Sequence, residues 1–206
     1  MLKARNLKFQ YSDHDKIIFS DLNFTIQVGE IVALLGPSGS GKSTLAHLLA
    51  GYLLAQEGEI IFQGKKNSGP GRDRIIISQE NDLFPFHTVI KHLNLVSSDQ
   101  AKNQQWLKLV GLENYQDKYP HELSGGMKKR LSFARALAAE SPFIIMDEPF
   151  SSLDQELKET LYQDLLKIVR EKNITILLIT HDQAEAEKLA GRVLYLDESG
   201  RIKDYQ

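Results

Sequence analysis

The sequence contains no cysteine among its 206 residues. Disulfide bonds and thiolate metal sites are therefore excluded, and a reducing compartment is compatible with the composition. No apolar run approaches the roughly 18–20 residues that a helix needs to cross a bilayer. The N-terminal residues also lack the apolar stretch of a signal peptide. We therefore expect a soluble chain that reaches any membrane through a partner.

An excess of positive charge is also missing, since 25 basic residues face 27 acidic ones. A nucleic-acid-binding domain is usually strongly basic, so we expect no nucleic-acid partner. Hydrophobic residues make up 42% of the chain, which is enough for a real core in one domain of this length.

Apolar patterns predict an α/β fold. Residues 2–11 and 17–28 alternate in polarity, as half-exposed antiparallel strands do. Continuous apolar runs, which are typical of strands buried on both faces, occur at residues 31–35, 143–146 and 174–179. Helical patterns follow these runs at residues 43–51, 155–172 and 183–189. Buried strands that alternate with helices indicate a mainly parallel sheet, with an antiparallel β subdomain at the N-terminus.

The middle of the chain differs from this pattern. Residues 80–140 carry helical patterns at 89–96, 101–110 and 126–139, and no strand pattern. We predict one domain over 1–206, in which 1–79 and 141–206 form the core and 80–140 is an inserted helical subdomain. Residues 64–72 are rich in glycine and are expected to form a loop.

A complete Walker A loop follows the first buried strand and opens a helix. Its glycines let backbone N–H groups approach phosphate oxygens, and the helix start adds positive partial charge. We expect Lys42 on the β- and γ-phosphates, the Ser43 hydroxyl on Mg²⁺ and Thr44 near the α-phosphate. The loop predicts a nucleoside triphosphate ligand, bound by Gly36, Pro37, Ser38, Gly39, Ser40, Gly41, Lys42, Ser43 and Thr44.

Two acidic residues end the buried strand at 143–146, which is the Walker B pattern. The carboxyl ends of parallel strands face the ligand crevice of such a sheet. We therefore expect Asp147 to hold Mg²⁺, directly or through a water molecule. Glu148 is expected to polarise the attacking water.

Two more polar residues follow predicted strands and should reach the same edge of the sheet. His181 comes after the run at 174–179, where it can contact the γ-phosphate and the water. Gln79 comes after the apolar residues at 75–77, and its amide can reach Mg²⁺ or water. The predicted catalytic residues are Lys42, Gln79, Glu148 and His181, and the predicted metal ligands are Ser43, Gln79 and Asp147.

A second glycine-rich segment lies at the start of the helical pattern at 126–139. It reads Leu123-Ser124-Gly125-Gly126-Met127 and resembles the LSGGQ signature of ABC ATPases. A helix start of this kind is another anion-binding site, yet one chain has no second triphosphate to fill it. The resemblance implies a head-to-tail homodimer that sandwiches two ATP molecules, and two-fold symmetry would fill both sites at once. Ser124, Gly125, Gly126 and Met127 would then cover the partner's nucleotide.

The resemblance covers residues 2–198 and implies further roles. Tyr11 is similar to the aromatic residue that stacks on adenine in this family, with packing on an edge strand as the alternative. Gln79 resembles the Q-loop glutamine, residues 152–154 the D-loop, and His181 the switch histidine. Met127 replaces the usual signature glutamine, as in the groups that resemble nitrate, sulfonate and taurine importers.

The resemblance favours the ATP-binding subunit of an importer over other members of the family. Residues 82–89 resemble the stretch that grips a helix of the membrane subunit, although ordinary packing is an alternative. We expect a cytoplasmic subunit held at the membrane by permease subunits, which serve a substrate-binding protein. The alternatives are a non-transport ABC ATPase, or an ATP-binding regulatory module that does not hydrolyse. Glu148 and His181 argue against the second, and the absence of heptads argues against coiled-coil members of the first.

Overall fold

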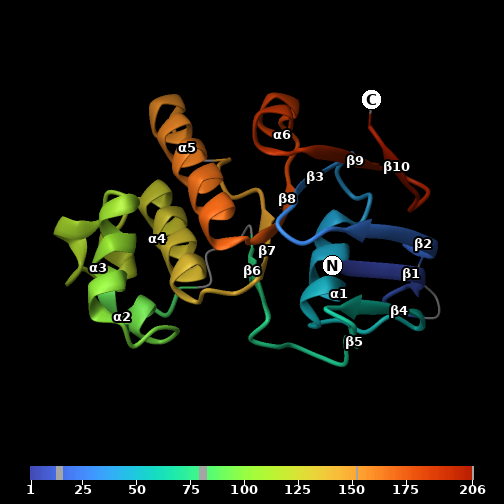
Figure 1. Cartoon of the computed structure of the whole chain (residues 1–206), viewed down its shortest axis with the longest axis horizontal. Coiled ribbons are helices and arrows are strands. Elements are labelled where there is room, and N and C mark those ends of the chain that lie inside the picture. Colours follow the sequence, from blue (N-terminus) through green and yellow to red (C-terminus); the bar gives the residue numbers. More distant parts are fainter. Residues whose placement is uncertain (13–15, 79–82, 152, 206) are drawn as a thin grey trace.

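The computed structural model describes residues 1–12, 16–78, 83–151 and 153–205. Two sheets and a group of helices make up the chain (Figure 1). In the described residues the larger sheet has six strands in the order β10-β9-β3-β8-β7-β6. Their bounds are β3 (Ile31–Leu35), β6 (Arg74–Ile77), β7 (Phe143–Asp147), β8 (Thr175–Ile179), β9 (Arg192–Leu196) and β10 (Ile202–Asp204).

The buried apolar runs form the middle of this sheet, as the sequence predicts. β3, β7 and β8 are buried at every position and pair in parallel. Their side chains alternate between two cores, because successive residues of a strand point to opposite faces. Ile145 and Leu177 belong to one cluster, whereas Ile144 and Ile176 belong to the other. A strand between two cores must be apolar throughout.

The smaller sheet is antiparallel and has the strand order β2-β1-β4-β5. Its strands are β1 (Leu2–Phe9), β2 (Phe19–Ile26), β4 (Glu57–Phe62) and β5 (Lys65–Lys66). Helix α1 (Lys42–Ala50) packs between the two sheets, since Leu45, Leu48 and Leu49 share one cluster with residues of β1, β2, β7 and β8. This packing fixes the start of α1 beside the carboxyl ends of β3 and β7.

One sequence expectation, about a loop, was wrong. Residues 64–72 were expected to be a loop, but Lys65–Lys66 pairs with β4 across Gln63 and Gly64. Both turn residues have positive φ, which suits a tight two-residue hairpin turn, and the exposed lysines give no apolar signal. In addition, β9 is followed by β10, a short edge strand with partly exposed residues.

The helices lie at one end of the molecule and along the larger sheet (Figure 1). The end opposite β1, β2 and β4 holds α2 (Val89–Asn94), α3 (Gln100–Leu109) and α4 (Gly125–Ala138). We call these three helices the helical lobe; the described residues from 83 to 138 contain no strand. The remaining helices are α5 (Gln155–Lys172) and α6 (Gln183–Leu189), together with short 3-10 turns at Glu113–Tyr115 and Pro120–Glu122.

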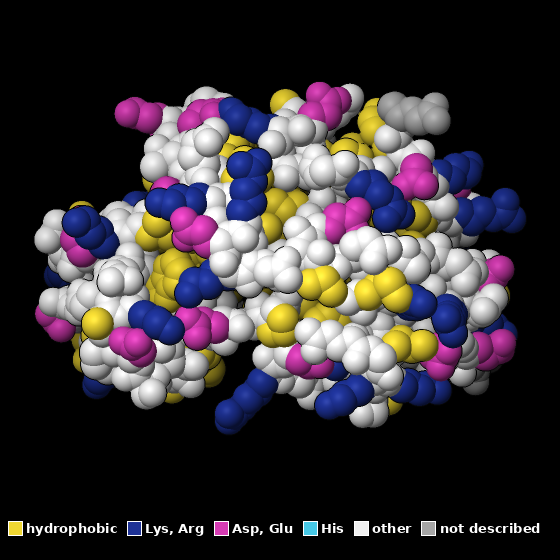
Figure 2. Space-filling view, in the orientation of Figure 1, with side chains coloured by type: hydrophobic (Ala, Val, Ile, Leu, Met, Phe, Trp, Pro, Cys, Tyr) yellow, Lys and Arg dark blue, Asp and Glu magenta, His cyan; other side chains and the backbone are white. Residues whose placement is uncertain are grey.

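The amphipathic pattern of α5 predicts its buried face. Leu161, Leu165 and Val169 are buried in the cluster that contains Ile144 and Ile176. Leu157 is partly buried and packs against the same cluster. Within the described parts of the chain, no helix is long and apolar enough to cross a bilayer. Basic and acidic side chains are interspersed over the face shown in Figure 2, without a large area of one sign.

Candidate active site

The Walker A loop has a conformation that requires glycine at two positions. A Cβ on Gly36 would lie 2.3 Å from the carbonyl oxygen of Leu196. Gly41 has φ of 101°, and a Cβ there would lie 2.6 Å from Ile18. Gly41 is also the N-cap of α1 and provides no side-chain cap, so the first N–H groups of the helix remain available for an anion.

Lys42 lies across this loop. Its ammonium donates hydrogen bonds to the carbonyl oxygens of Gly36 and Pro37, both at 2.8 Å. Burial lowers the pKa of Lys42, and the nearby carboxylates of Asp147 and Glu148 oppose that shift. The cation is therefore held at the loop by backbone oxygens and by the negative charge at the end of β7.

Asp147 ends β7 and is only 5% exposed. Burial raises its pKa; a hydrogen bond with the Ser43 side chain acts in the opposite direction. A buried carboxylate beside a hydroxyl is a suitable pair of oxygen donors for Mg²⁺, which is bound through one or two protein groups, phosphate and water. The described residues contain no cluster of three or more acidic or histidine side chains that could hold a metal alone. The donors thus fit a magnesium ion that is shared with a phosphate.

Glu148 and His181 meet at the same edge of the sheet. Oε1 of Glu148 lies 3.0 Å from Nδ1 of His181, and the two side chains are 21% and 68% exposed. The backbone N–H of Glu148 donates to the Ile179 carbonyl oxygen at 2.9 Å, which continues the pairing of β7 with β8. Glu148 has φ of 51°, a left-handed conformation that costs a non-glycine residue about 1–2 kcal/mol. The end of the strand therefore turns this carboxylate toward His181.

Two contacts near this edge were not predicted from the sequence. Glu185 is buried, accepts a hydrogen bond from Thr180 and lies 3.4 Å from the Tyr162 hydroxyl. It thereby anchors the segment that carries His181. Lys129 of α4 donates to the Glu148 carbonyl oxygen. The contacts of Glu185 with Tyr162 and of Lys129 with Glu148 join residues far apart in the chain, so no local pattern signals them.

Tyr11 lies beside the end of the Walker A loop. Its hydroxyl is 3.0 Å from the Thr44 hydroxyl, and its ring packs edge-on against Phe9 at 5.1 Å between centroids. The side chain is nevertheless 59% exposed. The contact with Phe9 fits the packing alternative, and the exposed ring beside Thr44 fits the stacking one.

The signature segment is not part of this constellation. Ser124 is the N-cap of α4, and its hydroxyl accepts from the Met127 N–H at 3.3 Å. A Cβ on Gly125 would meet no heavy atom within 4 Å, so the helix start faces open space. Figure 1 places α4 in the helical lobe, apart from α1. Two sequence predictions, Gln79 and Ser152 of the D-loop, lie outside the described residues.

The sequence of this chain is similar to that of known ATP-binding proteins. The family model described as "ABC transporter" matches residues 19–151. The nitrate import ATP-binding protein NrtD of Synechocystis sp. is 40% identical over 87% of this chain and 71% of its own length. The taurine import ATP-binding protein TauB of Escherichia coli is 38% identical over 98% of this chain and 82% of its own.

Solved structures agree with the sequence relatives. The dimeric structure of MJ0796, described as a bacterial ABC transporter cassette, has a TM-score of 0.90 and 28% identity. It matches all of this chain and 98% of the other. A second dimeric structure of MJ0796, in a post-hydrolysis state with ADP and Pi, aligns equally well. On its family match, its relatives and its fold, this chain belongs to the ABC transporter family.

Proposed function

We propose that this chain is the ATP-hydrolysing subunit of an importer and that its Walker A loop and β7 form the reaction site. The observation that carries the proposal is the convergence of Lys42, Ser43, Asp147, Glu148 and His181 at one sheet edge. Lys42 and the N–H groups of α1 bind the phosphates, and Ser43 and Asp147 hold Mg²⁺. The magnesium ion neutralises charge on the β- and γ-phosphate oxygens when bound.

Glu148 is the group that orients and polarises the attacking water in this proposal. Its carboxylate stands next to His181, which lies where it can contact the γ-phosphate. Tyr11 stacks on the adenine, because its exposed ring is joined to Thr44 at the α-phosphate end of the loop. Gln79 is proposed as a further ligand of Mg²⁺ or water.

The site is completed by a second copy of the chain. Ser124, Gly125, Gly126 and Met127 lie at a helix start that faces open space in the helical lobe. In a head-to-tail dimer each of these helix starts covers the nucleotide on the other copy. The dimeric structures of MJ0796, including the one with ADP and Pi, support this arrangement. Two-fold symmetry then gives two equivalent sites.

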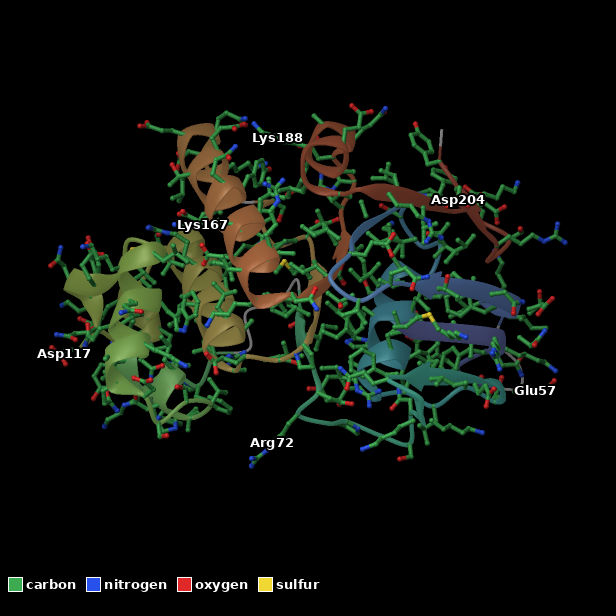
Figure 3. All side chains as sticks on the ribbon, in the orientation of Figure 1. Glu57, Arg72, Asp117, Lys167, Lys188 and Asp204 are labelled. Atoms are coloured by element: carbon green, nitrogen blue, oxygen red, sulfur yellow. The ribbon has the colours of Figure 1, made fainter. Side chains whose placement is uncertain are left out.

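The membrane subunit docks at the helical lobe, near α2. Exposed apolar side chains flank this helix, with Phe84 and Phe86 before it and Leu95 and Val96 after it. A groove of about 440 Å³ lies next to its end and is lined by residues that include Tyr52, Arg72, Leu95, Val96 and Ser97. Figure 3 shows Arg72 projecting away from the ribbon. Such a groove fits a short helix of a permease, which would place the chain at the inner face of a membrane.

The import direction rests on the relatives, which are named for nitrate and taurine import. A substrate-binding protein is the remaining partner of such a system.

The chain divides into a core and an inserted helical subdomain at 80–140. This subdomain carries both the signature helix and the docking groove, so closure of the dimer would move the groove and the membrane subunit bound to it.

Co-purification tests the proposal. The tagged chain is expressed with its candidate permease, and the complex is assayed for phosphate release from Mg²⁺-ATP. We expect the chain to retain the permease and to hydrolyse ATP, with a rate that rises when the substrate-binding protein and its solute are added. Retention should be lost in Phe86→Asp. ATP binding without phosphate release would instead identify a regulatory module, and hydrolysis that is indifferent to any permease would remove the transport role.

A further inference from the structure

The start of α4 and the catalytic carboxylate are connected within one chain through Lys129. Its ammonium donates to the Glu148 carbonyl oxygen at 3.2 Å and to the Ser151 hydroxyl at 2.5 Å. The Ser151 hydroxyl donates to the same carbonyl oxygen at 3.1 Å. Lys129, Ser151 and Glu148 therefore form a closed triangle that we call the carbonyl clamp.

The clamp acts on a residue whose backbone conformation is unfavourable. Glu148 has positive φ although it is not glycine, and such a conformation persists only where neighbours hold it. Its N–H is fixed by the Ile179 carbonyl oxygen, and its own carbonyl oxygen is fixed by the clamp. With both sides of the residue fixed, the carboxylate is aimed at His181.

The charges around Lys129 favour an ammonium at this position. Burial lowers the pKa of Lys129, and the carboxylates of Glu148, Asp147 and Glu185 oppose the shift. Lys158 of α5 is the nearby cation that acts in the same direction as burial. A half-buried cation among three carboxylates is retained by attraction to them, and it reaches the β7 turn from another part of the fold.

We propose that Lys129 is a positioning residue for the water-polarising carboxylate, so that the helix carrying the signature sets the orientation of Glu148 in the same chain. This inference rests on the proposed role of Glu148. A movement of α4 that pulled Lys129 from the clamp would release Glu148 from its strained conformation. The ammonium itself touches neither nucleotide nor water in this role.

The test compares Lys129→Met, which keeps an unbranched apolar stem without the ammonium donors, with Lys129→Arg, which keeps a cation. We expect Lys129→Met to lower kcat for ATP about tenfold to a hundredfold, while KM and the Kd for ATP stay within about twofold. Lys129→Arg should recover most of kcat. Lys108→Met removes an exposed lysine of the same lobe and should behave as the parent. Melting temperatures of all variants report whether the fold is retained.

A double-variant comparison separates positioning from a general structural effect. In the Glu148→Gln background, Lys129→Met should not lower the residual rate further, because the group on which it acts is gone. An additional tenfold loss there, a rise in KM with unchanged kcat, or no effect of Lys129→Met in the parent would overturn the inference. If Glu148→Gln itself retains the parent rate, the proposed function fails as well, so the two failures are distinguishable.

Discussion

Two glycine-rich helix starts occur in this chain, and they differ in their N-caps and in the side chains that surround them. α1 begins after Gly41, which gives no side-chain cap, and Lys42 and the carboxylates of β7 surround it. α4 begins after Ser124, whose hydroxyl already accepts from the Met127 N–H, and it faces open space. The start of α1 combines N–H groups that can donate to phosphate with oxygen atoms that can bind a metal ion. The start of α4 offers N–H groups alone. A helix start becomes a reaction site only when groups from other strands converge on it.

Glu148→Gln has the largest expected effect and tests the site at the start of α1, where strand residues converge. The substitution keeps the shape of the side chain and removes the carboxylate that we propose polarises water. We expect hydrolysis to fall by about 10²–10⁴-fold while ATP binding remains. An ATP-bound dimer should accumulate, which light scattering after gel filtration measures. Hydrolysis at the parent rate would show that Glu148 is not the group that acts on water.

Ser124→Arg tests the site at the start of α4, on which no described strand residues converge. The bulky side chain fills the open space at the start of α4, so a partner's nucleotide cannot approach it. Turnover should fall by about 100-fold or more, since the donors no longer reach the phosphates. ATP binding by the monomer, measured by calorimetry, should change less than about twofold.

Ser124→Thr is the matched control for this variant, because threonine keeps the N-cap hydroxyl. It should retain most of the activity. Loss of ATP binding in the Ser124→Arg monomer would place the signature in the chain's own nucleotide site and contradict the difference between the two helix starts.

Tyr11→Ala gives a smaller expected effect at the edge of the site at the start of α1. Loss of a stacked ring costs about 1–3 kcal/mol per base, so KM for ATP should rise about 5- to 150-fold. Tyr11→Phe keeps the ring and loses only the hydroxyl that contacts Thr44, and it should stay within about threefold of the parent. If both variants behave alike, the hydroxyl contact rather than stacking supports the nucleotide.

The smallest expected effect is a pH dependence of the Mg²⁺ requirement, which we expect only for the site at the start of α1. Burial raises the pKa of Asp147, so this carboxyl takes up a proton at a higher pH than an ordinary aspartate. A protonated carboxyl is a poor Mg²⁺ ligand, and the Mg²⁺ concentration for half-maximal activity should therefore rise as the pH is lowered toward the raised pKa of this carboxyl. ATPase titrations with Mg²⁺ measure it. A requirement that does not change as the pH is lowered would exclude Asp147 as the titrating ligand.

The sequence predicts those parts of the fold and site that local patterns encode. The continuous apolar runs of β3, β7 and β8 and the four-residue repeat in α5 are such patterns, and the structure confirms them. The position of Asp147 and Glu148 follows because acids at the end of a parallel strand reach the crevice. β5 escaped prediction because a two-residue turn and two exposed lysines carry no apolar signal.

Contacts between distant elements could not be predicted in the same way. The contact between Tyr162 and Glu185 depends on how α5 and α6 pack together, and the carbonyl clamp depends on how α4 packs against the β7 turn. Lys129 stands in a run of basic residues, where sequence alone indicates a solvated charge. Only the packing of the helical lobe shows that its ammonium reaches the backbone of Glu148.

The alternation of β7 side chains between two cores has a consequence for how the protein can change over generations. Ile144 and Ile145 are neighbours in the chain, yet the first packs with the helical lobe and the second with α1. A substitution on one side can be compensated by neighbours on that side alone. The half that packs with α1 can thus remain constant while the lobe proposed to dock a membrane subunit adapts to a different permease.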